Sequence, residues 1–359
     1  MQTARSQTLF SLTLCIASLL AIQPSAIESQ TTAAQAPAAQ ESLARELPFD
    51  PAVVTGQLKN GLRYYIRTNA KPENRAELWL AVNAGSLQED DDQQGLAHFV
   101  EHMAFNGTEN FAKQDLVDYL ESIGMQFGPD INAFTSFDET VYTLTVPTDD
   151  EAIVSQAFQI LEDWAHGLAF QGEEIDKERG VVIEEWRLGR GAQARIRDKQ
   201  FPVLFKSSRY ADRLPIGKKE ILETAPHDNF RRFYADWYRP DLMAIIAVGD
   251  FDPAVIESKI HQHFGNLEGP DIARSREAYP VPDHSETLYS ITTDPESTNT
   301  TVSIYYKLDK QPVSTVGDYR RQLVEQLYHS MLNARLDELR QQADPPFLFA
   351  FSTSAGSAL

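Results

Sequence analysis

The feature that most constrains this chain is a pair of histidines four residues apart in the stretch "GLAHFVEHMAFNGT". If residues 93–105 form a helix, His98 and His102 lie on one face, with Glu101 beside them. Two neutral imidazoles suit zinc, but a hydrolytic zinc site needs a third protein ligand and an open position for water. Glu101, adjacent and not a ligand, is then a candidate general base for that water.

The same pattern is open to another interpretation, since five residues of this kind also arise by chance in exposed or helix-capping clusters. The neighbouring residues favour the metal. Apolar side chains surround the two histidines and the glutamate, namely Leu96, Ala97, Phe99, Val100, Met103, Ala104 and Phe105. This composition predicts a largely buried helix, and buried His and Glu side chains need partners. The sequence therefore predicts a metal-binding helix.

A second predicted helix, "EEIDKERGVVIEEWRLGR", offers candidates for the third ligand. Glu178 and Glu185 are seven residues apart and share one face, whereas Glu184 is rotated away towards solvent or a neighbouring arginine. One carboxylate of the pair would bind the metal, and the other would orient a ligand histidine. The residue pattern alone leaves open which of the two is the ligand.

The N-terminal residues have the layout of a secretory signal. Arg5 is the only charge before the apolar run "LFSLTLCIASLLAI", and small residues follow in "QPSA". The run is too short and too mixed for a membrane span. Cys15, the only cysteine, lies inside it, so the mature chain has no disulfide, which favours export to a bacterial periplasm. We expect a signal peptide over residues 1–26 and a flexible Ala/Gln-rich linker over 27–46.

The charge balance excludes one class of partner. The formal net charge is −20, and a chain this acidic is a poor binder of phosphate backbones, so we expect no nucleic-acid partner. The short acidic run "QEDDDQQ" at residues 88–94 is expected to be solvated surface.

Alternation and turn signals predict strands on both sides of Asn60-Gly61 and over "AELWLAV", "DLMAIIAVGD" and both ends of "INAFTSFDETVYTLTVP". Helical patterns follow over residues 113–123 and 153–168, and Asp252-Pro253 begins another helix.

Prolines and a glycine in "LEGPDIARSREAYPVPDH" place a domain boundary between residues 268 and 269. We expect a first domain over 47–268 and a second over 269–359. The second should hold a strand at "TVSIYYKL", a long amphipathic helix with an apolar face from Val324 to Leu339, and a strand beginning at "FLFAFSTSAGSAL". Because the pattern stops there, the second domain is expected to be incomplete.

Taken together, these motifs resemble the inverzincin superfamily of pitrilysin, insulin-degrading enzyme and the mitochondrial processing peptidase. "GLAHFVEHMAFNGT" resembles the family's zinc helix, "NAFTSFDETVY" its substrate-binding edge strand, and "KERGVVIEEW" its second zinc helix. The resemblance covers about residues 47–340 and is most specific between 95 and 188. Among its members, the chain is most similar to the long exported bacterial zinc proteases.

The resemblance implies an α+β fold of the LuxS/MPP-like metallohydrolase type, a mainly antiparallel sheet covered by helices, followed by a related second domain. It implies one zinc ion on His98, His102 and Glu185, with Glu101 as base and Glu178 as the carboxylate that orients a histidine. The family's usual spacing from the second histidine would select Glu178 as ligand instead. An insertion around "MQFGPDI" accounts for that difference.

The resemblance further implies that Asn132, Ala133 and Phe134 bind the substrate backbone by strand addition. The expected function is that of an exported zinc metalloendopeptidase acting on peptides or unfolded segments, with a second homologous half as partner. The alternatives are a non-catalytic scaffold or partner half, and an inactive fragment of a longer peptidase. The residue types are also compatible with manganese or cobalt in place of zinc.

Overall fold

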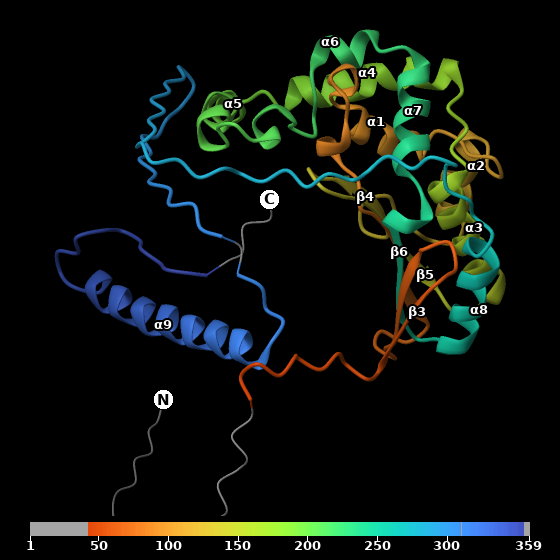
Figure 1. The fold of residues 1–359 in the computed structure, drawn as a ribbon, viewed down its shortest axis with the longest axis horizontal. Helices are drawn as coiled ribbons and strands as arrows, with labels where there is room; N and C mark the ends of the chain where they lie inside the picture. The colour runs from red at the N-terminus through yellow and green to blue at the C-terminus, as the bar shows by residue number, and fades with distance from the viewer. Residues whose placement is uncertain (1–41, 310, 355–359) are drawn as a thin grey trace, which may run out of the picture.

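A six-stranded sheet forms the centre of the computed structural model, which describes residues 42–309 and 311–354 (Figure 1). The strand order is β1-β2-β6-β3-β5-β4. The strands are β1 Val53–Gln57, β2 Arg63–Thr68, β3 Arg75–Val82, β4 Ile131–Thr135, β5 Thr140–Pro147 and β6 Met243–Gly249. Neighbouring strands are antiparallel except for β2 and β6, which are parallel. The predicted α+β class with a mainly antiparallel sheet is therefore confirmed.

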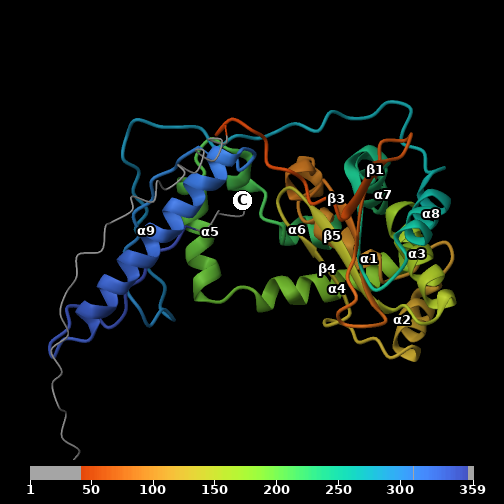
Figure 2. The same cartoon turned by 90° about the horizontal axis from the view of Figure 1, so that it is seen from below.

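Helices gather in two groups around this sheet (Figures 1 and 2). α3 and α8 pack against each other and against the strands, whereas α1, α4, α6 and α7 pack together near the end of the sheet that carries β4. The helices are α1 Leu96–Met103, α2 Lys113–Ser122, α3 Glu151–His166, α4 Gly172–Leu188, α5 Ala192–Leu204, α6 Lys219–Thr224, α7 His227–Trp237, α8 Pro253–Phe264 and α9 Val316–Arg340. Short 3-10 turns η1 (Ser86–Gln88) and η2 (Asp91–Gln93) lead into α1, and η3 (Arg209–Asp212) and η4 (Pro240–Leu242) lie further on.

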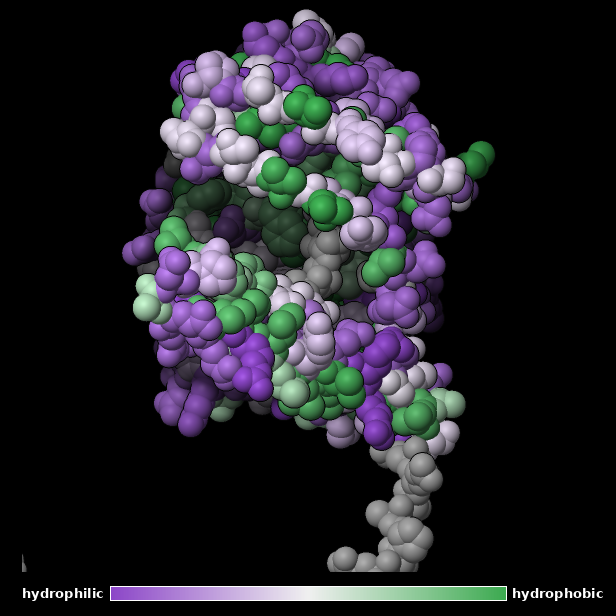
Figure 3. All heavy atoms as spheres, turned by 90° about the vertical axis from the view of Figure 1, so that its left-hand side faces the viewer, coloured by the Kyte–Doolittle hydropathy of each residue, from purple (hydrophilic) through white to green (hydrophobic). Residues whose placement is uncertain are grey.

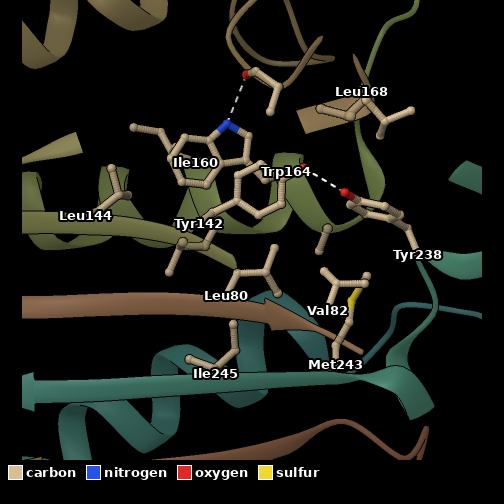
Figure 4. Packing of buried hydrophobic residues seen from close by; sticks show 14 of the residues in the cluster. Leu80, Val82, Tyr142, Leu144, Ile160, Trp164, Leu168, Tyr238, Met243 and Ile245 are labelled. Atoms are coloured by element: carbon tan, nitrogen blue, oxygen red, sulfur yellow. Dashed lines mark hydrogen bonds between the residues drawn. The ribbon is translucent and has the colours of Figure 1, made fainter. Parts of the chain in front are cut away.

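The core lies between the sheet and the helices that pack on it, and Figure 4 shows the part between the sheet and α3. Leu78, Leu80 and Val82 of β3 are fully buried, as their alternation predicted. Trp164 of α3 is also fully buried, and its indole N–H donates to the carbonyl of Ala104 at 2.9 Å. This bond ties α3 to the residue that ends α1, so packing of the core also fixes the position of that helix.

The predicted hairpin at Asn60-Gly61 is confirmed, because β1 and β2 pair in antiparallel register on either side of it. Gly61 adopts a φ of +97°, a left-handed conformation that favours glycine. The Asn60 side-chain amide donates to the carbonyls of Phe264 at 2.7 Å and Leu267 at 2.9 Å, so this turn also holds the end of α8.

The region after residue 268 differs from its prediction. Residues 301–308 and 347–354 form no strand, so the two strands expected there are wrong as far as the structure describes them. Isolated strands gain nothing without a neighbour to pair with their backbone groups, and no neighbouring strand lies beside either segment in the described chain. The predicted long helix is confirmed as α9, which Thr315 and Asp318 cap reciprocally.

Three expectations fall wholly or partly outside the described residues: the signal peptide, most of the Ala/Gln-rich linker, and the last five residues of the C-terminal segment. The boundary between residues 268 and 269 stays a prediction. No helix among the described residues is long and apolar enough to cross a membrane.

Residues 270–309, here called the connecting segment, join α8 to α9 without regular secondary structure. In Figure 1 this segment runs in cyan and light blue from α8 past β4 to the neighbourhood of α5, and α9 lies apart from the sheet. Seen from the side of α5 and α9, the surface of the molecule has a deep hollow (Figure 3). Apolar side chains line parts of that opening.

Candidate metal centre

A buried carboxylate fixes the start of α1. Glu89 is fully buried, and its Oε1 accepts hydrogen bonds from the backbone amides of Gly95 and Ala97, each at 2.9 Å. Burial raises the pKa of the Glu89 carboxyl well above its usual range, although these two amides lower it in part. The prediction that the run at residues 88–94 is solvated surface is therefore wrong for Glu89 and for the buried Gln88, Gln93 and Gln94, and only Asp91 and Asp92 are exposed. This residue satisfies amides that a helix N-terminus otherwise leaves unpaired.

α1 presents its two histidines to one point. Leu96, Ala97, Phe99, Val100 and Met103 bury one side of the helix, and the imidazoles emerge on the other. The Nε2 atoms of His98 and His102 lie 3.2 Å apart. Two neutral imidazole nitrogens this close repel through their lone pairs unless a proton or a cation lies between them.

α4 runs beside α1, and several of its side chains bond to neighbouring elements, Arg179 among them (Figure 1). Arg179 donates to the carbonyl of Leu222 at 2.7 Å and to that of Ala225 at 2.5 Å. Glu178 and Glu185 face α1, since both carboxylates come close to His102. Glu184 instead pairs with Arg187 on the exposed side, as its rotation around the helix predicted.

Three ligand atoms converge. Glu185 Oε1 lies 3.7 Å from His98 Nε2, and Glu185 Oε2 lies 3.4 Å from His102 Nε2. Ligand atoms about 2.0–2.2 Å from a tetrahedral zinc lie about 3.3–3.6 Å from one another. The distance between the two Nε2 atoms, and the distance from each of them to one Glu185 oxygen, are thus close to those between ligands of a zinc ion. Among the residues that the structure describes, this is the one His/Cys/Asp/Glu group arranged to hold a metal ion.

Glu178 has a different partner atom. Its Oε1 lies 2.9 Å from His102 Nδ1, the ring nitrogen that faces away from the ligand cluster. A proton on Nδ1, donated to Glu178, leaves the Nε2 lone pair free for a metal. Burial lowers the pKa of His102, but the hydrogen bond and charge of Glu178 outweigh it, and the pKa lies above the ordinary value. The two carboxylates that the residue pattern left open thus lie against different ring nitrogens of His102.

His98 is held neutral by its surroundings. Burial, with a smaller contribution from the nearby His102, lowers its pKa to about 3. Its Nδ1 is buried and has no hydrogen-bond partner among the described residues. A neutral imidazole with its Nε2 turned towards the cluster is the form that binds zinc.

Glu101 lies beside the cluster without joining it. Its carboxylate is buried, and Oε2 accepts a hydrogen bond from the Thr135 hydroxyl at 2.5 Å. Burial raises the pKa of Glu101, whereas the bond from Thr135 lowers it in part. Thr135 belongs to the stretch "NAFTSFDETVY" but was not singled out from the sequence, since only the fold shows that its hydroxyl reaches α1.

β4 is an edge strand, and it contacts α1. The Ser136 amide donates to the Glu139 carbonyl and closes the turn to β5, so by alternation Ala133 directs its backbone groups to the free edge. The Ala133 amide accordingly donates to its neighbour's side chain, Asn132 Oδ1, at 2.9 Å. The side chains of Asn132 and Phe134 lie on the exposed side of β4. The three predicted substrate residues therefore lie together on an edge that can accept another strand.

Two family models match the chain. The model of the insulinase domain, peptidase family M16, matches residues 64–193, and that of the M16 inactive domain matches residues 224–358. The first match contains every residue of the candidate centre.

Named relatives are zinc proteases. The chain is 42% identical to a "Zinc protease PQQL-like" protein of Arabidopsis thaliana, over 84% of this chain and 31% of that protein. It is 38% identical to the "Probable zinc protease PqqL" of Escherichia coli, over 84% of this chain and 32% of that protein. The chain thus spans about a third of the length of these relatives.

Solved structures show the same fold. The crystal structure of the first half of the periplasmic protease PqqL from Escherichia coli matches with a TM-score of 0.75 and 36% identity. The match covers 82% of this chain and 63% of that one. The structure of the whole Escherichia coli protein matches with the same TM-score, and there the match covers 33% of the longer chain.

Proposed function

The chain belongs to the peptidase M16 family, and on that premise we propose that it is the metal-bearing part of a zinc metalloendopeptidase. His98, His102 and Glu185 would hold one zinc ion. Glu178 would fix the tautomer of His102, and Glu101 would be the general base. The observation that carries the proposal is the convergence of the three ligand atoms beside a buried carboxylate that is not one of them.

Each residue of the candidate site has a distinct role in this proposal. Zinc bound at the site supplies a Lewis acid and a water of lowered pKa. Glu101 takes a proton from the attacking water and returns it to the leaving amine. Its raised pKa makes it a better proton acceptor than an exposed glutamate, and the Thr135 hydroxyl holds its carboxylate in one orientation. The site therefore pairs a metal with a pre-oriented base.

Peptide binding would use the edge of β4. An extended substrate can add to Ala133 as a further strand, which aligns its backbone with the sheet and leaves side-chain selection to neighbouring surfaces. Asn132 and Phe134 flank that position from the exposed side. Because β4 also carries Thr135, the strand that binds the peptide is the one that positions the base.

We further propose export to a Gram-negative periplasm and a second homologous half as partner. The relative in Escherichia coli is described as periplasmic, and this chain matches about a third of its length. The signal layout at residues 1–26 agrees with that compartment.

The test is cleavage of a library of quenched fluorogenic peptides by the purified chain and by Glu101→Gln. Loss of the base should lower the rate by at least about 100-fold while zinc content stays the same. Glu184→Gln is the matched control, because Glu184 is an exposed glutamate on α4 whose ion pair among the described residues is with Arg187. If cleavage survives Glu101→Gln, the assigned base is wrong.

Thr135 offers a second and milder test. Thr135→Val keeps the shape of the side chain but removes the hydroxyl that contacts Glu101, so kcat should fall by about tenfold with zinc retained. Thr135→Ser should restore most of the rate. Equal rates in Thr135→Val and the wild type would show that this hydroxyl does not position the base.

A further inference from the structure

Two arginines of the connecting segment contact the loop before α1 and the turn after β4, which adjoin the two elements that present the candidate site. The segment passes close to β4 on its way from α8 to the region of α5 (Figure 1). Arg274 and Arg276 lie two residues apart in it, in the sequence "ARSRE". Neither residue belongs to the metal centre, and neither is a part of the base or the substrate edge.

Arg274 holds the loop that leads into α1. Its guanidinium donates to both carboxylate oxygens of Asp90, at 2.9 and 3.1 Å, and to Asp236 at 2.8 Å. The same group lies over the ring of Trp237, 5.1 Å from its centroid. Asp90 directly follows Glu89, the carboxylate that caps α1. Arg274 therefore fixes the residue next to the helix cap.

Arg276 holds the turn between β4 and β5. It donates to the carbonyl of Asn83 at 2.6 Å, to the Asp138 carbonyl at 3.2 Å and to Asp138 Oδ1 at 3.1 Å. The Tyr210 hydroxyl donates to the other oxygen of Asp138 at 2.6 Å. Asp138 thus joins the connecting segment, the turn and η3. From that turn β4 runs back to Thr135, whose hydroxyl contacts Glu101.

Exposed ion pairs contribute little on their own, so the geometry decides whether these contacts matter. The Arg276 side chain is only 20% exposed, and it donates to two backbone carbonyls as well as to a carboxylate. An arginine fork that contacts several acceptors loses less freedom per bond than an isolated pair. The turn is also held by backbone bonds from Ser86 and Leu87, so loss of Arg276 should loosen it without unfolding it.

The connecting segment carries a matched contact elsewhere. Arg195 of α5 donates to Asp294 at 2.7 and 2.8 Å and to Glu296 at 2.7 Å. This pairing also attaches the same segment through three hydrogen bonds of one arginine, but to a helix that contributes no residue to the candidate site. A comparison of Arg195 with Arg276 therefore separates attachment of the segment from positioning of the site.

We propose that Arg276, together with Arg274, is a positioning residue. Through these two arginines the connecting segment holds the β4–β5 turn and the cap of α1 in fixed relative positions, an arrangement here called the clamp. The Thr135 hydroxyl is thereby kept in contact with the Glu101 carboxylate. The clamp rests on the proposed function for its catalytic consequence and on the contacts above for its structural one. It makes the path between α8 and α9 a working part of the site.

The experiment compares hydrogen exchange and kinetics in Arg276→Gln and Arg195→Gln. Amides of residues 131–140 should exchange about 3- to 10-fold faster in Arg276→Gln than in the wild type. Their exchange rates should be the same in Arg195→Gln as in the wild type. With a cleaved peptide, kcat should fall by about the same factor in Arg276→Gln, with zinc content retained. Arg276→Lys, which cannot reach three acceptors at once, should recover only part of the loss.

The outcomes distinguish the clamp from the proposed function. Equal exchange of residues 131–140 in Arg276→Gln and Arg195→Gln overturns the clamp, whatever the activity. Faster exchange with an unchanged kcat overturns its role in positioning. If the wild type shows no Glu101-dependent cleavage, the proposed function fails, and the exchange measurement still decides whether the segment holds the turn.

Discussion

Two helices with similar sequence patterns end in opposite surroundings. α3 and α9 both carry apolar residues at helical spacing. In α3 this stripe is buried against the sheet, with Phe158, Ile160, Leu161 and Trp164 fully inaccessible. In α9 no residue is buried, and Leu327 and Met331 are 64% and 72% exposed. Periodicity thus predicted both helices correctly, but it did not predict which one is packed.

The difference lies in what surrounds each helix. α3 faces β3 and β5, two neighbouring strands of a completed sheet. The segments expected to form strands near α9 pair with no strand in the described chain and remain without regular secondary structure. An amphipathic stripe stabilises a fold only when an apolar surface covers it. Two pairs of substitutions and one change of pH test how much packing stabilises each part of the chain, in decreasing order of the expected change in unfolding free energy.

The largest effect should come from paired truncations in the two helices. Trp164→Ala empties a fully buried site and removes the indole bond to Ala104, so it should lower the free energy of unfolding by about 3–5 kcal/mol. Leu327→Ala, on the exposed side of α9, should change it by less than about 0.5 kcal/mol. Urea denaturation of both variants measures the two values. A cost of several kcal/mol in Leu327→Ala would mean that α9 is packed in solution.

A pair of arginines sharpens the same contrast. Arg179 anchors α4 through two carbonyls from a largely buried position, so Arg179→Gln should cost about 2–3 kcal/mol. Arg335 of α9 pairs with Glu338 on an exposed surface, and Arg335→Gln should cost less than about 0.5 kcal/mol. Denaturation midpoints of the two variants check this. Equal losses of unfolding free energy in the two variants would show that the side chains of α4 and α9 are held equally firmly.

The smallest effect should be the pH dependence of the contact between Arg274 of the connecting segment and Asp90 before α1. The hydrogen bond from Arg274 lowers the pKa of Asp90 below its ordinary value of 3.8. A carboxyl with a lowered pKa stabilises the fold above its ordinary pKa, and this contribution is lost as pH falls through the lowered value. Because the pair is partly exposed, the contribution should stay below about 1 kcal/mol.

The measurement is the difference in unfolding free energy between the wild type and Arg274→Gln, followed from pH 6 to pH 3. That difference should shrink on acidification. A difference that grows as pH falls would show that Asp90 is not the acceptor that matters.

Much of the structure before residue 269 could be predicted, because the sequence signals for its turns, strands and helices come from residues close together in the chain. The turn at Asn60-Gly61, the alternation of Leu78, Leu80 and Val82, and the i, i+4 histidines each specify structure through neighbours in sequence. The choice between Glu178 and Glu185 was not local. It depends on the depth and rotation at which α4 lies beside α1, and the bonds from Arg179 to Leu222 and Ala225 contribute to that placement.

Three residues show where sequence patterns gave no signal. Glu89 lies in an acidic run whose composition indicates solvent, yet it folds back onto the start of α1. Thr135 is an ordinary strand residue until β4 is placed beside α1. Arg276 contacts Asp138 and Asn83, which precede it by 138 and 193 positions in the sequence. Such contacts arise only from the tertiary fold.

The most direct test of the account is the zinc content of the purified wild type and three glutamate variants, each confirmed to be folded. The account predicts about one zinc per chain in the wild type and in Glu184→Gln, loss of zinc in Glu185→Gln, and mostly retained zinc in Glu178→Gln. A folded wild type that binds no zinc, or a site that loses zinc with Glu178 and keeps it without Glu185, would contradict the assignment of the metal centre.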